Sequence, residues 1–326
     1  MKKILFGILV CVMLLTGCGK TSGEKIQSGK VKTGAYTIQD AQGTVVKLSQ
    51  KPQRILTDSL GLDELVIGLT KPENLVGINY LDADENISFI SRETAKHKNR
   101  LRSYTSEEII ALRPDVFLAT TWFPQDKIIG LRQAGIPVVV CRGPTNIQEV
   151  KATVLLVAEV LKEKECGKNI LAQMDEELEK IATVIKKLGK PWPKVLLVSL
   201  MSSYGGTGSL YDSLCERAGV INVISKAGLR NGAFLSKELI VKAQPDIFLF
   251  SQPSKDDAKE YEKYRVNFLA DLVWQTIVAK KKVLVLQDKY IYCSSQNIIY
   301  GIKALANTCY QRELFSLAGE KCIKGW

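Results

Sequence analysis

Short apolar runs alternate with amphipathic stretches along most of the chain. Runs of this length predict buried strands, and they occupy residues 55–57, 75–78, 116–120, 138–141, 195–200, 247–250 and 283–286. Helical spacing predicts helices at residues 62–69, 107–112, 127–133, 210–218, 237–243 and 297–317. Parallel strands need a long crossover between them, which is usually a helix, so this alternation is typical of parallel βα units. Because the pattern starts again after Pro193, we expect two α/β lobes of similar plan.

One amphipathic stretch lies between the two halves. Its apolar positions fall three or four residues apart, at Ile170, Met174, Leu178, Ile181, Ile185 and Leu188. This spacing predicts a helix over 167–188, about 33 Å long, that ends at Gly189 and Pro191. We therefore expect two Rossmann-like lobes, 35–166 and 189–326, each with a mainly parallel sheet flanked by helices and joined by one long rigid helix. An internal helix of a single domain is the alternative.

The N-terminus has the pattern of an export signal. Lys2 and Lys3 precede an apolar run over 4–15, which is too short to span a bilayer as a helix. The following Leu15-Thr16-Gly17-Cys18 resembles a bacterial lipobox, so we expect 1–17 to be removed and Cys18 to carry lipid. Residues 18–34 are rich in Gly, Ser, Thr and Lys and predict a flexible tether. The folded part would then sit outside the cytoplasmic membrane; an ordinary signal peptide with an incidental cysteine is the alternative.

Composition is that of a globular protein, with 326 residues, 46% hydrophobic and 24% charged. Removing 1–17 lowers the formal net charge from +11 to +9. The lysines are spread out and no nucleic-acid motif occurs, so we interpret the charge as a solvated surface near anionic lipid and expect no nucleic-acid partner. Six cysteines remain besides Cys11 and Cys18, and either disulfides or buried free thiols are compatible with them.

A segment is repeated in the two halves. Residues 105–120, TSEEIIALRPDVFLAT, match residues 236–251, SKELIVKAQPDIFLFS, at a fixed offset. Thr105 and Ser236 are good N-cap residues, which places Glu107 and Glu238 at the second helical position. A carboxylate there is favoured by the helix dipole by about 0.3–1 kcal/mol, which alone suffices to explain either glutamate.

Several segments together resemble a known family, the class III substrate-binding lipoproteins of ABC importers for ferric siderophores, haem and vitamin B12. They are YTIQDAQGTVVKLSQKPQRIL near the start, the twin E-x6-PD segments, RAGVINVI, and the final CSSQNIIYGIKALANTCY. The resemblance covers about residues 36–318. It implies a monomeric receptor that binds an iron-siderophore-type metal chelate and delivers it to an ABC permease dimer with its ATPase; a corrinoid or haem is the alternative ligand. It also implies that Glu107 and Glu238 dock on permease arginines.

In such folds ligands bind between the lobes, at loops after strand carboxyl ends. The candidate ligand residues are Ser59, Tyr80, Trp122 and Arg142 in the N-terminal lobe and Tyr204, Gln252, Tyr290 and Tyr292 in the C-terminal lobe. Aromatics with an arginine would suit a rigid, partly anionic chelate, although each side chain could instead pack on its own lobe.

Metal and enzyme chemistry find little support in the sequence. The chain has one histidine, His97, and no CxxC, so we expect no protein-held metal site and no resident cofactor. The Gly-rich turn at 205–208 is neither a dinucleotide fingerprint nor a P-loop. Because no catalytic motif appears, we expect a binding protein rather than an enzyme; an enzyme or a surface sensor on the same scaffold are the remaining alternatives.

Overall fold

The computed structural model describes residues 34–326, except 202, 234–235 and 272–280. The N-terminal lobe holds a parallel sheet of β3 (Ile55–Thr57), β6 (Val116–Thr120) and β7 (Val138–Cys141) in that spatial order. A parallel bridge between Ile55 and Leu75 brings in the short parallel pair β4 (Ile78–Asn79) and β5 (Arg100–Leu101). An antiparallel hairpin of β1 (Tyr36–Gln39) and β2 (Val45–Leu48) precedes them.

The C-terminal lobe is built on the same plan. Its parallel sheet has the order β11-β10-β8-β9, with β8 at Lys194–Val198, β9 at Ile221–Asn222, β10 at Ile247–Gln252 and β11 at Lys282–Gln287. The repeated segment supplies β6 in one sheet and β10 in the other. β6 lies between β3 and β7, and β10 lies between β8 and β11. The predicted α/β class with two parallel sheets is confirmed.

Helices flank both sheets. They are α1 (Leu60–Leu69), α2 (Ser91–Thr94), α3 (Ser106–Leu112), α4 (Gln125–Gln133), α5 (Ile147–Val160), α6 (Lys164–Leu188), α7 (Leu210–Ala218), α8 (Val223–Lys226), α9 (Lys237–Ala243), α10 (Ala258–Ala270), α12 (Asp288–Ile291) and α13 (Ile298–Tyr310), with 3-10 turns at Pro72–Asn74 and Tyr80–Ala83. The predicted helix at 297–317 is wrong at its end. Helix α13 stops at Tyr310 because Gln311 takes a left-handed conformation, with φ 51°.

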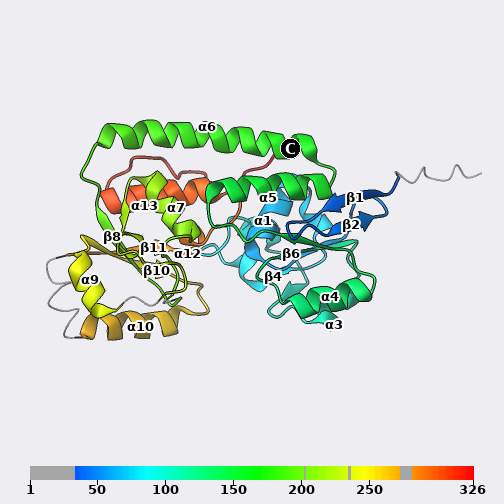
Figure 1. The fold of residues 1–326 in the computed structure, drawn as a ribbon, viewed down its shortest axis with the longest axis horizontal. Helices are drawn as coiled ribbons and strands as arrows, with labels where there is room; N and C mark the ends of the chain where they lie inside the picture. Colours follow the sequence, from blue (N-terminus) through cyan, green and yellow to red (C-terminus); the bar gives the residue numbers. More distant parts are fainter. Residues whose placement is uncertain (1–33, 202, 234–235, 272–280) are drawn as a thin grey trace, which may run out of the picture. The chain divides into compact units, whose positions relative to one another are not determined.

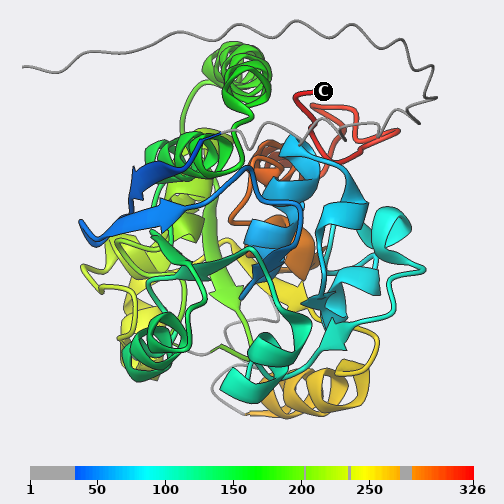
Figure 2. The same ribbon diagram turned by 90° about the vertical axis from the view of Figure 1, so that its right-hand side faces the viewer.

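Helix α6 runs over α5, α7 and α13, as Figure 1 shows, and Figure 2 gives the view along it. Its apolar stripe, which includes Ile170 and Ile181, belongs to one buried cluster that also contains Leu118 of β6 and Leu249 of β10. The preceding residues in the two strands, Phe117 and Phe248, face separate cores on the other side of each sheet. The lobes thus share one core beneath α6, and the repeated Phe-Leu pair supplies both sides of each sheet.

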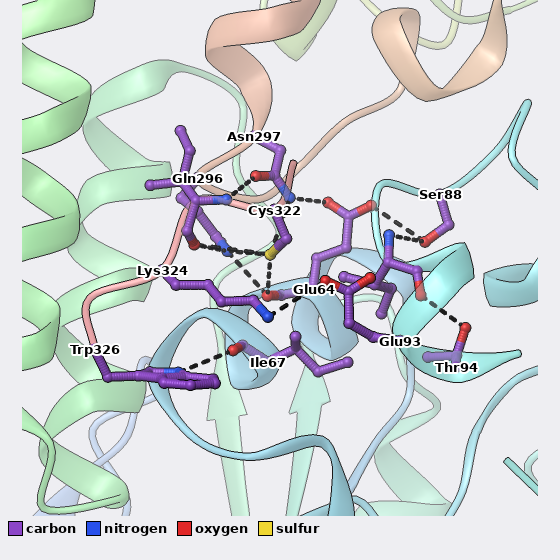
Figure 3. Close-up of polar contacts among 12 residues, drawn as sticks. Glu64, Ile67, Ser88, Glu93, Thr94, Gln296, Asn297, Cys322, Lys324 and Trp326 are labelled. Atoms are coloured by element: carbon purple, nitrogen blue, oxygen red, sulfur yellow. Dashed lines mark hydrogen bonds and ion pairs between the residues drawn. The ribbon is translucent and has the colours of Figure 1, made fainter. Parts of the chain in front are cut away.

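The last five residues cross back from the C-terminal lobe to α1, and we call residues 322–326 the C-terminal strap. The Gly325 N–H donates to the Gly68 carbonyl at 2.9 Å, and the Trp326 indole donates to the Ile67 carbonyl at 3.3 Å. Lys324 forms an ion pair with Glu93 at 3.3 Å (Figure 3). The chain therefore connects the lobes here as well as through α6.

The cysteines in the described part of the chain are free thiols. Cys141, Cys215, Cys293, Cys309 and Cys322 are buried, and Cys166 is half-buried. Burial raises the pKa of the Cys309 and Cys322 thiols to about 12, so both are protonated and unreactive near neutral pH. Of the two alternatives that the sequence left open, the structure therefore has the buried thiols.

Candidate ligand pocket between the lobes

The repeated segment forms the same helix-to-strand unit in both lobes. Thr105 and Glu108 make a reciprocal capping box at the start of α3, and the Ser236 hydroxyl accepts from the Leu239 N–H at 3.3 Å at the start of α9. Glu107 and Glu238 are the second residues of these helices, as predicted, and both are exposed. The pKa of Glu238 is lowered by a hydrogen bond from its own backbone N–H and by the Ser236 hydroxyl.

The Pro-Asp pair of each copy fastens the unit to its sheet. The Asp115 carboxylate accepts from the Gln53 and Arg54 N–H groups at 2.9 and 3.0 Å, just before β3. Its counterpart Asp246 accepts from the Lys194 N–H at 2.9 Å, at the start of β8. Each aspartate therefore holds the amino end of the neighbouring strand, which explains why the pair is repeated.

A cavity of about 370 Å³ lies between the lobes, at the carboxyl ends of β3, β10 and β11. Both lobes contribute to its wall. The apolar lining comes from Leu60, Leu81, Ile87, Met201 and Pro253, and the polar lining includes Ser59, Ser254, Ser294, Tyr292, Glu64, Asp257, Asp288 and Lys289. We call this cavity the interlobe pocket. Its position is that at which open α/β sheets bind ligands.

A larger hollow of about 620 Å³ lies at the start of α7 and around Trp192. Its polar side chains bond one another: the Asp212 carboxylate accepts from Asn222 and Ser225 at 2.9 and 3.0 Å. These three side chains therefore satisfy one another, whereas polar groups of the interlobe pocket, such as Asp288, keep an atom without a partner in the described structure. We therefore take the interlobe pocket as the better candidate.

Glu64 of α1 joins the lobes at the back of the pocket (Figure 3). Its carboxylate accepts from the Phe89 N–H and the Asn297 amide, both at 2.9 Å, and from the Ser88 and Ser295 hydroxyls. Burial raises the pKa of Glu64, and these donors oppose the shift. Since Ser295 and Asn297 belong to the C-terminal lobe and Phe89 to the N-terminal lobe, the Glu64 carboxylate links the two lobes by hydrogen bonds.

The two lobes also touch at the rim of the pocket. The Gln287 amide donates to Asn86 at 2.7 Å, and the Lys255 N–H donates to Asp84 at 2.7 Å. At Gly61 the lobes are so close that a Cβ atom would lie 2.1 Å from the Ser294 hydroxyl oxygen. Glycine is thus required here by close approach.

Two of the sequence-predicted ligand residues, Ser59 and Tyr292, line the interlobe pocket. The Tyr292 hydroxyl hydrogen-bonds to Ser199, and burial raises the tyrosine's pKa, which keeps it protonated. The Tyr204 ring packs on the Tyr292 ring with centroids 5.0 Å apart, so it backs the lining. Gln252 is exposed at the end of β10, next to the lining residue Pro253.

The other predicted ligand residues lie outside the lining. Tyr290 is buried and donates to Glu320 at 2.8 Å, and the Tyr80 ring lies 4.0 Å from the Arg102 guanidinium. Trp122 is 66% exposed and covers Gly143, whose Cβ would meet its ring at 2.4 Å. Arg142 is half-exposed and lies 3.9 Å from the Glu149 carboxylate. The expected arrangement of aromatics facing an arginine does not form in this pocket.

Two lining carboxylates, Asp257 and Asp288, were missed in the sequence. Asp288 directly follows β11, so the rule that ligand residues come after strand carboxyl ends could have found it. Asp257 comes after β10 and starts α10, where the Ser254 hydroxyl donates to it at 2.6 Å. Burial raises the pKa of Asp288 to about 7.

The sequence matches the model of a known family. The sequence profile described as Periplasmic binding protein matches residues 59–290, which is most of the chain. The chain belongs to the periplasmic binding protein family. Members of this family bind small molecules outside the cytoplasm and work with an ABC permease and its ATPase; they are transport proteins rather than enzymes. In the described part of this periplasmic binding protein, no helix is both long and apolar enough to span a bilayer.

Curated relatives differ in the ligand that they are named for. A "Cobalamin-binding protein" of Halobacterium salinarum is 22% identical over 212 residues, which are 65% of this chain and 57% of that protein. The chain therefore spans little more than half the length of this relative. The "Probable siderophore-binding lipoprotein YfiY" of Bacillus subtilis is 25% identical over 311 residues, 86% of this chain and 89% of the relative.

Solved structures of the family share the fold. The periplasmic haem-binding protein RhuT from Roseiflexus sp. RS-1 superposes with a TM-score of 0.66 at 20% identity, over 79% of this chain and 98% of RhuT. The molybdate-binding protein MolA of Haemophilus influenzae gives 0.68 at 19% identity, over 85% of this chain and 91% of MolA. At these identities the match shows the two-lobed fold alone.

Proposed function

We propose that this periplasmic binding protein captures an iron-siderophore-type metal chelate in the interlobe pocket and delivers it to an ABC permease dimer. The signal sequence would direct export and then be cleaved after Gly17, and lipid on Cys18 would hold the protein at the outer face of the cytoplasmic membrane. Cys18 and the signal sequence lie outside the described residues. The named siderophore-binding relative, itself called a lipoprotein, covers the largest share of this chain among the curated relatives above and supports this choice.

The observation that carries the proposal is the pocket itself. It opens at the carboxyl ends of three parallel strands, draws its wall from both lobes and combines an aliphatic wall with a few polar groups. Its volume lies in the range of about 300–1,000 Å³ that is usual for small-molecule sites. A corrinoid or haem remains the alternative ligand, favoured by the cobalamin-binding relative and by RhuT.

A panel titration tests this function. The purified chain, without its signal sequence, would be titrated calorimetrically with ferric hydroxamate and ferric catecholate siderophores, haem and cobalamin. We expect one chelate to bind with a Kd of about 1 μM or below, which corresponds to roughly 8 kcal/mol. The absorbance spectrum of the freshly purified protein gives a second, independent readout if a coloured ligand copurifies. Failure of every compound to bind below millimolar concentration would overturn the proposal.

Docking on the permease belongs to the same proposal. Glu107 and Glu238 occupy equivalent positions, and Figure 1 shows α3 and α9 on the side of the sheets away from α6. One turn later, Ile110 is 45% exposed and Val241 is 46% exposed, again at equivalent positions. Each lobe thus presents one carboxylate beside one aliphatic side chain. A matched pair of contacts suits a partner with two equal halves, because each half then meets the same chemistry.

A further inference from the structure

The basic side chains around the interlobe pocket are already paired. Lys289, the one basic residue in the lining, bonds Glu320 at 2.6 Å, and its side chain is 12% exposed. At the rim, Lys255 pairs with Glu85 at 2.9 Å, and Arg102 lies 3.5 Å from Asp256. Each of these positive charges is therefore balanced by a carboxylate of the protein, and none is held free for an anionic ligand.

Two carboxylates in the lining have no basic partner among the described residues. Among the described residues, neither Asp257 nor Asp288 has a basic side chain within ion-pair distance. The Asp257 carboxylate accepts from the Ser254 hydroxyl alone at 2.6 Å, and the buried Oδ1 atom of Asp288 lacks a hydrogen-bond partner in the described structure. Glu64 differs from both, since donors from both lobes saturate its carboxylate. Above about pH 7, where Asp288 is ionised, the lining therefore carries an excess of negative charge near Asp257 and Asp288.

We infer that the interlobe pocket selects a neutral or cationic metal chelate and rejects a polyanionic one. This inference rests on the proposed function and names the ligand class. A bidentate hydroxamate brings one negative charge, so three of them leave a ferric complex neutral, and a pendant amine makes it a cation. A bidentate catecholate brings two, which leaves the ferric tris complex a polyanion. Ferric haem with two ionised propionates is a net anion too, with a smaller charge than the catecholate complex, and is also expected to bind more weakly than a cationic chelate.

The physical reason is the low effective dielectric of a pocket enclosed by protein. Asp288 is partly buried, so an anion next to it is repelled with less solvent screening than in water and loses affinity. Asp257 is exposed at the pocket wall, so its repulsion of an anion is screened more strongly. A chelate with a positive charge would pair with these carboxylates, which have no basic side chain of the described protein as a partner. This ligand class differs from the partly anionic chelate that the sequence predicts. That prediction depends on Arg142, whose side chain lies outside the lining, beside Glu149.

The test compares two iron chelates of opposite charge, ferrioxamine B as the cationic hydroxamate and ferric enterobactin as the catecholate polyanion. Isothermal titration at pH 8 and low ionic strength should give at least about tenfold tighter binding of ferrioxamine B. The substitution Asp288→Asn should weaken ferrioxamine B by about fivefold, and Asp257→Asn, at an exposed carboxylate, should weaken it by about twofold. Asp126→Asn, an exposed aspartate at the start of α4, is the matched control and should leave the affinity unchanged.

The outcomes separate this inference from the function on which it rests. Equal or tighter binding of ferric enterobactin, or of haem, would overturn the charge selection and leave chelate binding intact. Tighter ferrioxamine B binding in Asp257→Asn or Asp288→Asn would overturn it too. If neither probe nor any compound of the ligand panel bound, the proposed function would be overturned instead. Binding of a cationic corrinoid that weakens in the two variants would support the charge selection.

Discussion

Buried carboxylates at the pocket differ in how well the protein satisfies them. Glu64 sits among donors from both lobes, so its burial strengthens the contact between the lobes. Asp288 is largely buried but has one oxygen without a partner. A charge kept in this way costs stability, and such costs are typical of positions retained for function. Asp288 is therefore the residue at which stability and binding are expected to conflict.

Replacing Asp288 with Asn should stabilise the free protein in a pH-dependent manner. Burial raises the carboxyl pKa to about 7 in the folded state, against about 3.9 in the unfolded chain. A carboxyl with a raised folded pKa binds its proton more tightly when folded, so wild-type stability falls as pH rises from about 4 through 7. We expect Asp288→Asn to gain about 1–2 kcal/mol at pH 8 and almost nothing at pH 4, in urea unfolding.

The same unfolding experiment can contradict this account of Asp288. A gain of equal size at both pH values would mean that the carboxylate is not destabilised by burial, and would contradict the account of this residue. Asp126→Asn again serves as the exposed control: it should give no gain at pH 8 and at most lose the helix-dipole contribution of about 0.3–1 kcal/mol.

Residue-level roles were only partly predictable from sequence. Capping by Thr105 and Ser236 could be predicted because it depends on residues close in the chain. The role of Asp115 and Asp246 depends on strands distant in sequence, so the repeat could be seen but not its cause. Trp122 and Arg142 were chosen for their chemistry, yet neither side chain lines the interlobe pocket. Loop side chains have no periodicity to reveal where they point.

At the scale of elements, buried strands were the most predictable feature. Strands β3, β6 and β7 have the predicted bounds, because parallel strands that are covered on both faces appear as continuous apolar runs. Helices α5 and α10 were missed: one is apolar on much of its surface, and the other is mostly exposed. The end of α13 depends on the left-handed conformation of one residue, Gln311, which no sequence pattern predicts.

The C-terminal strap gives a prediction at this scale. A Cβ atom on Gly325 would lie 2.1 Å from the Cys166 carbonyl oxygen, a backbone atom of α6 that cannot move aside easily. We expect Gly325→Ala to displace the strap and to cost about 1–3 kcal/mol in urea unfolding. Gly130→Ala on α4 is the matched control: nothing lies within 4 Å of its Cβ position, and alanine favours helix by up to about 1 kcal/mol.

The difference in the free energy of unfolding between these two variants shows whether the C-terminal strap stabilises the fold. A strap that contributes to the fold makes Gly325→Ala less stable than wild type and Gly130→Ala equal or more stable. If Gly325→Ala unfolded at the same urea concentration as wild type, the strap would not be packed against α6 as described.

At the scale of the whole molecule, the two lobes are connected at three places. They share a core beneath α6, and the C-terminal strap and the Glu64 cluster join them again. Such a frame would hold Glu107 and Glu238 at a constant separation. A two-fold permease could then engage both, with each exposed ion pair contributing only about 0–1 kcal/mol and the pair setting orientation.

The double substitution Glu107→Ala with Glu238→Ala should abolish chelate uptake through the cognate permease while chelate affinity stays unchanged. Each single variant should reduce uptake less than the double variant, because one contact remains. Two exposed glutamates of α6, replaced together as Glu165→Ala with Glu176→Ala, are the control and should transport normally. Uptake that survives in the Glu107 and Glu238 double variant would remove docking from their role.

The central claim is that the ligand lies between the lobes, and calorimetric titration of a pocket-filling variant tests it most directly. Leu60→Trp places a larger side chain in the wall of the interlobe pocket, whereas Ile129→Trp puts the same indole on the exposed face of α4. We predict that Leu60→Trp weakens binding of the chelate identified in the ligand panel by at least about tenfold, and that Ile129→Trp binds like wild type. Unchanged affinity in a folded Leu60→Trp variant would contradict the account.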